Sequence, residues 1–151
     1  MDLNSCAERT LMAIGYQLST IYYYRLKGDS TMIQDHKDLI MWQKAMDMTA
    51  EVYRLAKLLP REETYALSDQ MRRAAVSVPS NIAEGYQRRS DGYIKHFLYI
   101  AKGSNAEVET QLLLCIRLGY FPQSEAQTAL KLIEEIAKML SVFIGKLADS
   151  R

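Results

Sequence analysis

The sequence contains few of the residues that break helices, cross-link chains or bind metals. Among 151 residues there are only three prolines, seven glycines, two cysteines and two histidines. Two cysteines are too few for a disulfide framework, which favours a reducing, cytoplasmic setting. The cysteines and histidines, at positions 6, 36, 96 and 115, match no metal-ligand spacing. We therefore expect no metal and no cofactor, and the scarcity of proline and glycine predicts long regular elements.

The chain also lacks an excess of charge of one sign. It has 19 Lys and Arg against 18 Asp and Glu, a formal net charge of +1. This balance argues against a generally polybasic nucleic-acid binder and leaves room for a local basic patch. The most apolar stretch, residues 11–26, contains Gln, Ser, Thr and Arg and is shorter than the ~20 apolar residues of a membrane-spanning helix. We expect no association with a membrane.

The pattern of residue types in the first part of the chain differs from that in the rest, and the change occurs at residues 31–35. We therefore divide the chain into an N-terminal extension, residues 1–31, and one domain, residues 32–151. Met32 offers an alternative start, so the extension need not belong to the natural protein. A domain of this length agrees with the usual size of a single folding unit.

Four segments of the domain repeat apolar residues at spacings of three and four, as one face of an α-helix does. They cover about 37–59, 62–84, 91–118 and 124 to the C-terminus. No segment shows the alternation typical of a strand. Lengths this similar, joined by short connections, favour an all-α fold, an antiparallel up-down-up-down four-helix bundle.

The boundaries of these helices are predicted from the capping residues, glycines and prolines near their ends. Pro60 ends the first helix, Gly85 is a C-cap for the second, Ser90 an N-cap for the third, and Gly119 closes it. Ser124 begins a capping box with Gln127 for the fourth. The small residues Gly103 and Ala74–Ala75 would let helices approach closely.

Pro79 falls inside the second helical pattern. A proline there removes one backbone donor and predicts a kinked second helix. Ser77 and Ser80 are close enough in sequence to satisfy the backbone groups that the proline frees.

Polar residues lie on or beside the apolar stripes of the second and third helices. Burying such a group without a partner costs of order 2–7 kcal/mol, so we expect these residues to form an interhelical network or to lie at an interface. A site for a polar ligand is the alternative. The residues are Asn81, Glu84, Ser104, Glu107 and Gln111.

Basic residues interleave with tyrosines around the second and third helices. Arginines next to aromatic rings suit phosphate contact and base stacking. A solvated, salt-bridged face is the competing interpretation, because acids are nearly as frequent in this region. The predicted contacts are Arg72, Arg73, Arg88, Arg89 and Lys95, with Tyr86 as a stacking residue.

Three ordered blocks, residues 37–46, 70–85 and 103–120, resemble the four-helix-bundle proteins encoded within 23S rRNA intervening sequences. The resemblance implies a small cytoplasmic bacterial protein with a kinked second helix. It also implies a ring-like homo-oligomer, a pentamer. The related accessory variability determinants of diversity-generating retroelements share the fold and are thought to bind nucleic acid and a reverse transcriptase through a basic surface. The resemblance implies no enzymatic activity, and it does not extend to residues 1–31.

These observations lead to one main hypothesis and two alternatives. The main one is a non-enzymatic, homo-oligomeric bundle that binds RNA or DNA, or a nucleoprotein partner, through the arginines. The first alternative is a protein–protein assembly module that binds no nucleic acid. The second, an enzyme, would need Glu84, Glu107 and His96 to come together, and their spacing does not require this.

Overall fold

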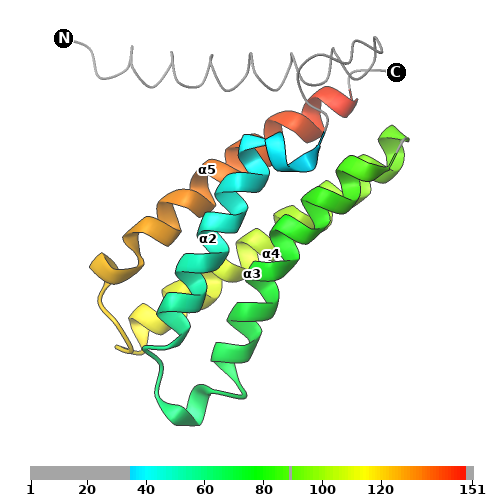
Figure 1. Ribbon diagram of the computed structural model, residues 1–151. Helices are drawn as coiled ribbons and strands as arrows, with labels where there is room; N and C mark the ends of the chain where they lie inside the picture. Colours follow the sequence, from blue (N-terminus) through cyan, green and yellow to red (C-terminus); the bar gives the residue numbers. More distant parts are fainter. Residues whose placement is uncertain (1–34, 89, 149–151) are drawn as a thin grey trace, which may run out of the picture.

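The computed structural model describes residues 35–88 and 90–148 (Figure 1). The proposed extension 1–31 and Arg89 lie outside the described residues. Within them the chain forms four α-helices and two short 3-10 helices, and no strand occurs in this part. The all-α four-helix fold predicted from the sequence is confirmed. In chain order the elements are η1 (His36–Asp38), α2 (Ile40–Ala56), η2 (Arg61–Glu63), α3 (Leu67–Gln87), α4 (Asp91–Arg117) and α5 (Gln123–Ala148).

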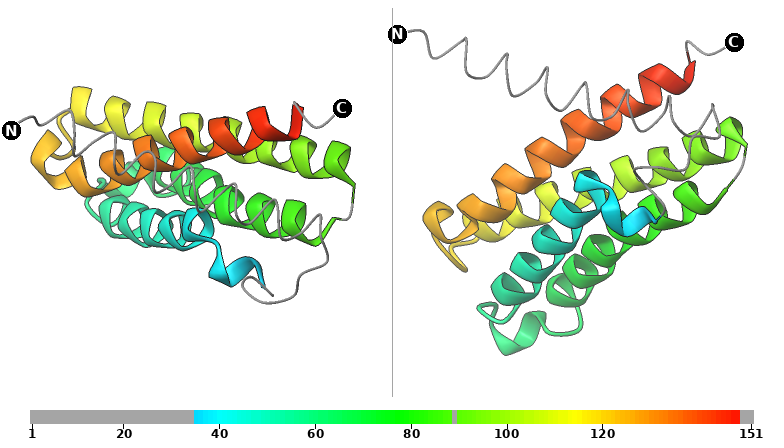
Figure 2. Two further views of the ribbon diagram at one scale, coloured as in Figure 1. Left: turned by 90° about the horizontal axis from the view of Figure 1, so that it is seen from above. Right: turned by 45° about the horizontal axis from the view of Figure 1, so that its top comes forward.

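Each helix packs against the next one along the chain, and α5 returns to pack against α2. In Figure 1 the chain runs down α2, up α3, down α4 and up α5. Figure 2 shows the α2–α3 pair and the α4–α5 pair lying against each other. The contact between α3 and α4 is the most extensive of all. Most of the predicted site residues belong to these two helices.

The apolar stripes of the four helices meet in one core. Its largest fully buried side chains come from every helix, for example Leu55, Met71, Leu112 and Ile133. Burial of each such side chain stabilises the fold by roughly 1.5–3 kcal/mol. The core thus follows directly from the spacing of apolar residues in the sequence.

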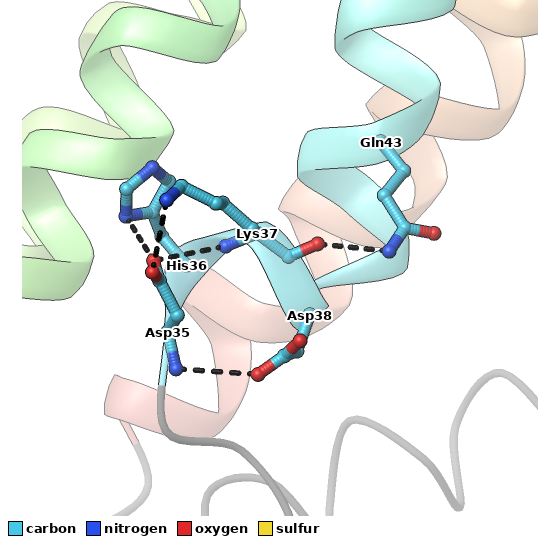
Figure 3. A network of polar contacts seen from close by, with 5 residues as sticks. All are labelled: Asp35, His36, Lys37, Asp38 and Gln43. Atoms are coloured by element: carbon cyan, nitrogen blue, oxygen red, sulfur yellow. Dashed lines mark hydrogen bonds and ion pairs between the residues drawn. The ribbon is translucent and has the colours of Figure 1, made fainter.

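The first helix is shorter than predicted at both ends. It begins at Ile40, after the 3-10 turn η1, and ends at Ala56, before Pro60 is reached. Figure 3 shows the network that fixes η1. The Asp35 carboxylate accepts a hydrogen bond from the Lys37 amide at 3.3 Å and lies 2.7 Å from His36 Nδ1. Asp38 Oδ2 in turn accepts a hydrogen bond from the Asp35 amide at 3.3 Å. The hydrogen bond from the Lys37 amide is the main reason why the pKa of Asp35 is lowered.

The second helix also differs from its prediction at both ends. It begins at Leu67, because residues 61–63 form η2 instead of a first helical turn. At its other end the helix continues to Gln87, so Gly85 is not a C-cap. Gly85 is buried, and a Cβ atom at this position would lie 3.1 Å from the Cβ of Phe97. The glycine is therefore needed for the close approach of α3 to α4. Gly103, from which we expected such an approach, has open space around it.

Pro79 lies within α3 and is buried; the kink itself stays a prediction. Proline has no N–H, so the carbonyl of Ala75, four residues earlier, loses its helical donor. The hydroxyl of Thr49 in α2 lies 3.0 Å from this carbonyl oxygen. Ser80 donates instead to Val76 O at 2.8 Å, and Ser77 has other partners, described below. The donor to the freed carbonyl is therefore Thr49 of α2, and not Ser77 or Ser80 of α3 as predicted.

The ends of α4 and the start of α5 agree with the sequence in part. Ser90 is the N-cap of α4, without a side-chain hydrogen bond to the helix. Gly119 follows α4 with φ = +75°, the left-handed conformation that favours glycine after a helix. The prediction for Ser124 is wrong: α5 already begins at Gln123, where Pro122 O accepts the Glu125 amide at 3.0 Å.

No helix within residues 35–88 and 90–148 is both long and apolar enough to cross a membrane. In the same part of the chain, no three His, Cys, Asp or Glu side chains gather closely enough to hold a metal ion.

Candidate functional site

Ser77 is the centre of a polar cluster between α3 and α4. Asn81 Nδ2 donates to Ser77 O at 2.7 Å and to Ser77 Oγ at 3.0 Å. Ser104 Oγ, from α4, donates to Ser77 Oγ at 2.9 Å. Two of the five predicted network residues, Asn81 and Ser104, are thus brought together through a third residue that was not among them.

The other three predicted network residues make contacts within their own helices. Gln111 Nε2 donates to Glu107 Oε1 at 3.0 Å, one turn apart on α4. Glu84 pairs with Arg88 at 2.6 Å near the end of α3. Gln111 is only 7% exposed, and its Oε1 atom has no hydrogen-bond partner among the described residues. A buried acceptor without a partner is energetically costly.

A polar groove lies beside these residues, between α3 and α4. Its volume is about 410 Å³, and it is open to solvent on one side. Hydroxyl, amide, guanidinium and carboxylate groups line it, so it suits a polar or charged group. The lining residues are Gln70, Arg73, Ala74, Ser77, Ser104 and Glu107.

Two buried polar residues were missed in the sequence. Asn105 is 2% exposed and donates through Nδ2 to Ile133 O at 3.0 Å, which joins α4 to α5. Ser68 donates to Ala56 O at 3.3 Å, which joins α3 to the end of α2. The signal for Asn105 was present, because it follows Ala101 by four residues and precedes Val108 by three, in phase with the buried face.

The predicted basic residues do not form one patch. Arg72 lies near the start of α3 and Arg88 directly follows its last residue, sixteen positions later, which places them about 24 Å apart along the helix axis. Arg72 lies over the ring of Tyr53 in α2, with its Cζ 5.8 Å from the ring centroid. Arg73 forms an ion pair with Asp69, one turn away. The predicted basic residues thus divide into two groups. We call Arg72 and Arg73 the middle group, and Arg88 with Arg89 and Lys95, which follow it in the sequence, the end group.

The end group lies where α3 passes into α4. Besides pairing with Glu84, Arg88 holds its guanidinium 5.4 Å from the centroid of the Phe97 ring. Lys95 follows on α4 and is half-buried. Arg89, the next residue after Arg88, lies outside the described part of the chain.

Tyr86 is half-buried against the core. The tyrosines that offer most ring surface near the end group are Tyr93 and Tyr99, which are 62% and 53% exposed. Of the tyrosines that interleave with the basic residues, these two are better placed for stacking than Tyr86.

Cys115 is fully buried on α4, with its Sγ 3.6 Å from the Met71 sulfur. Burial, and secondarily the charge of Glu63, raises the pKa of this thiol to about 11. The thiol is therefore protonated at neutral pH and unsuited to nucleophilic chemistry. His96 is exposed on the same helix, and its ring lies edge-on to Phe97.

Comparison with known proteins agrees with this architecture. A protein of unknown function of the S23 ribosomal protein family from Bacteroides thetaiotaomicron VPI-5482 has a similar crystal structure, with 27% sequence identity and a TM-score of 0.63. The match covers 69% of this chain and 98% of that one. No curated protein matches the chain.

The family model for the 23S rRNA-intervening sequence proteins matches residues 37–142. The match begins in η1, includes all of α2, α3 and α4, and ends in α5. It therefore contains most of the core, the Ser77 cluster and the buried proline of α3 together. On this evidence the chain belongs to the family of 23S rRNA-intervening sequence proteins.

Proposed function

We propose that this protein is a non-enzymatic, cytoplasmic bundle that binds RNA or DNA as a homo-oligomer. The observation that carries the proposal is the local charge where α3 meets α4. Residues 84–102 contain four Lys and Arg against two Asp and Glu, in a chain with a net charge of only +1. The end group thus concentrates positive charge that the rest of the chain lacks, as phosphate binding requires.

Aromatic surface accompanies this charge. Lys95, Tyr99 and Lys102 follow each other at spacings of four and three on α4, so they share one face of the helix. Tyr99 is half-exposed between the two lysines. A ring flanked by cations can stack on a base while the cations contact the neighbouring phosphates. In an oligomer the same small surface would be repeated, which raises avidity without a high charge per chain.

A protein–protein assembly module without nucleic-acid binding is the second candidate. It is favoured by exposed apolar side chains along α4 and at its end, among them Tyr93, Ile100, Leu114 and the C-cap residue Leu118.

A pull-down of the full chain from native lysate, with and without nuclease, separates the two candidates. The proposal predicts that nucleic acid is recovered without nuclease, and that an Arg88→Ala/Arg89→Ala variant recovers several-fold less. The control is Lys57→Ala/Lys131→Ala, which removes two positive charges at exposed positions elsewhere. Equal recovery by the arginine variant and the wild type would contradict the proposed site. Recovery of proteins alone, unchanged by nuclease, would favour the assembly module.

A further inference from the structure

The polar groove between α3 and α4 owes its shape to the sizes of its side chains. Its floor consists of short side chains that are buried or half-buried, and its rim of long side chains that are exposed. The floor residues are Ala74, Ser77 and Ser104, and the rim residues are Gln70, Arg73 and Glu107. The groove volume of about 410 Å³ lies within the range of small-molecule sites, about 300–1,000 Å³.

Two opposite charges line the rim without pairing with each other. Arg73 belongs to α3 and Glu107 to α4, and the ion pair that Arg73 forms is with Asp69, which does not line the groove. This pair uses Nη1 of the guanidinium, which has further N–H groups to donate. Glu107 accepts one hydrogen bond, from Gln111 Nε2, and no cation in the described part of the chain pairs with it. The rim therefore offers one cation and one anion, on opposite helices.

The floor of the groove adds one unused hydroxyl hydrogen. Ser77 and Ser104 share a single hydrogen bond, with their Oγ atoms 2.9 Å apart. Asn81 Nδ2 donates to Ser77 Oγ at 3.0 Å. Two hydroxyl groups carry two hydrogens, and only one of these is used between the serines. The other has no acceptor among the described residues, so it can be donated to an oxygen atom of a ligand.

We infer that the polar groove binds a free α-amino acid with an uncharged polar side chain. The ligand carboxylate accepts hydrogen bonds from the planar guanidinium of Arg73. The ligand ammonium group, with three donors, binds the carboxylate of Glu107. The hydroxyl or amide oxygen of the ligand side chain accepts the unused hydrogen of the serine pair. A ligand with a single charge would leave one of the two rim charges without a partner.

The inferred site is separate from the nucleic-acid surface of the proposed function. Arg88 and Lys95 of the end group do not line the groove. The middle group contributes Arg73 to it. The inference therefore assigns a second binding function to the same pair of helices, and each function can be tested without the other.

Isothermal titration calorimetry of the full chain tests the inference, with L-serine, L-threonine, L-asparagine and L-glutamine as probes. We expect saturable binding of at least one of them. L-Leucine, whose side chain accepts no hydrogen bond, should bind about ten-fold more weakly than the tightest probe. The N-acetyl derivative of that probe lacks the ammonium group, and its methyl ester lacks the carboxylate. Each should bind about ten-fold more weakly or worse, because a hydrogen bond to a charged group is lost.

Two substitutions remove the rim charges one at a time. Glu107→Gln and Arg73→Gln each keep a polar side chain, and each should weaken binding of the tightest probe about ten-fold or more. One control is Glu109→Gln, at an exposed carboxylate two positions further along α4. The other is Lys138→Gln, at an exposed cation that pairs with a carboxylate one turn away on α5, as Arg73 does on α3. Both controls should bind within about two-fold of the wild type, and circular dichroism verifies that every variant is folded.

Two results would overturn the inference. The first is a folded wild type that binds none of the four probes saturably, which would make the groove a solvated gap between two helices. The second is binding that is unchanged in Glu107→Gln or Arg73→Gln, or that the N-acetyl derivative or the methyl ester equals, because the rim charges would then not recognise the ligand. Neither result bears on nucleic-acid binding by the end group.

Discussion

The hydroxyl of Thr49 lies 3.0 Å from the carbonyl oxygen of Ala75, the acceptor that Pro79 leaves without its helical donor. The same hydroxyl is 2.8 Å from Ala45 O in its own helix, so its single hydrogen is shared between two carbonyls. The contact joins α2 to α3 at a half-buried position. It explains how α3 accommodates a proline in its interior.

Thr49→Val should destabilise the fold by about 1–3 kcal/mol, because it keeps the side-chain shape and leaves a buried carbonyl without a donor. Urea unfolding at a fixed protein concentration measures this change. Ser80→Ala is the control. It removes a hydroxyl from an exposed position where Val76 O keeps its helical partner, so its effect should stay within about 0.5 kcal/mol.

The same account makes Thr49 and Pro79 energetically coupled. Pro79→Ala restores an N–H for Ala75 O, so Thr49→Val should cost about 1 kcal/mol less in that background than alone. Equal costs in both backgrounds would show that the Thr49 hydroxyl does not serve the carbonyl freed by the proline.

Two glycine substitutions should change stability in opposite directions. Alanine generally stabilises a helix interior by about 1 kcal/mol relative to glycine. At Gly103 nothing lies within 4 Å of the new Cβ, so Gly103→Ala should be stabilising. At Gly85 the new Cβ would meet the Phe97 Cβ at 3.1 Å, and overpacking of about 1–3 kcal/mol should outweigh the helix propensity.

Thermal unfolding of the two glycine variants and the wild type gives the comparison. A Gly85→Ala variant as stable as Gly103→Ala would mean that α3 and α4 are not in close contact at this point.

The buried thiol of Cys115 predicts a stability that depends on pH in the alkaline range. Its pKa is about 11 in the folded chain against an ordinary value of 9.0. Between these values the unfolded chain binds fewer protons than the folded one, so the free energy of unfolding falls as pH rises from 9 to 11. The loss should reach roughly 2–3 kcal/mol, and below pH 9 it is absent.

Unfolding of the wild type and Cys115→Ala from pH 8 to 10.5 isolates this contribution. Tyrosine and lysine titrations contribute to both proteins and cancel in the difference. The difference in free energy of unfolding between the wild type and Cys115→Ala should decrease as pH rises. A difference that does not change with pH would contradict the raised pKa.

The apolar periodicity of the sequence was sufficient to predict four helices and most of the core, because burial selects one face of each helix. Helix ends were predicted less well. Residues 61–63 look helical in composition, yet they form a separate 3-10 turn that Tyr120 anchors by donating to Glu63 at 2.8 Å. Such a contact joins residues 57 positions apart and leaves no local signal.

The glycines show the same limit. Gly85 has the sequence context of a C-cap, and only the position of Phe97 on another helix reveals why it is needed. At the candidate site, the structure links Asn81 and Ser104, two of the five polar residues that the sequence indicates on α3 and α4. The sequence did not show that Ser77 links them, nor that Arg72 and Arg73 contact different neighbours.

The central claim, that the end group binds nucleic acid, is tested most directly by the salt dependence of RNA binding. Fluorescently labelled structured RNA is titrated with the full chain at several salt concentrations, and log Kd is plotted against log salt. The account predicts a steep slope for the wild type, reduced by about 1.4–1.8 in Arg88→Ala/Arg89→Ala and unchanged in Lys57→Ala/Lys131→Ala. Binding that is absent at low salt, or a slope that the two arginines do not alter, would contradict it.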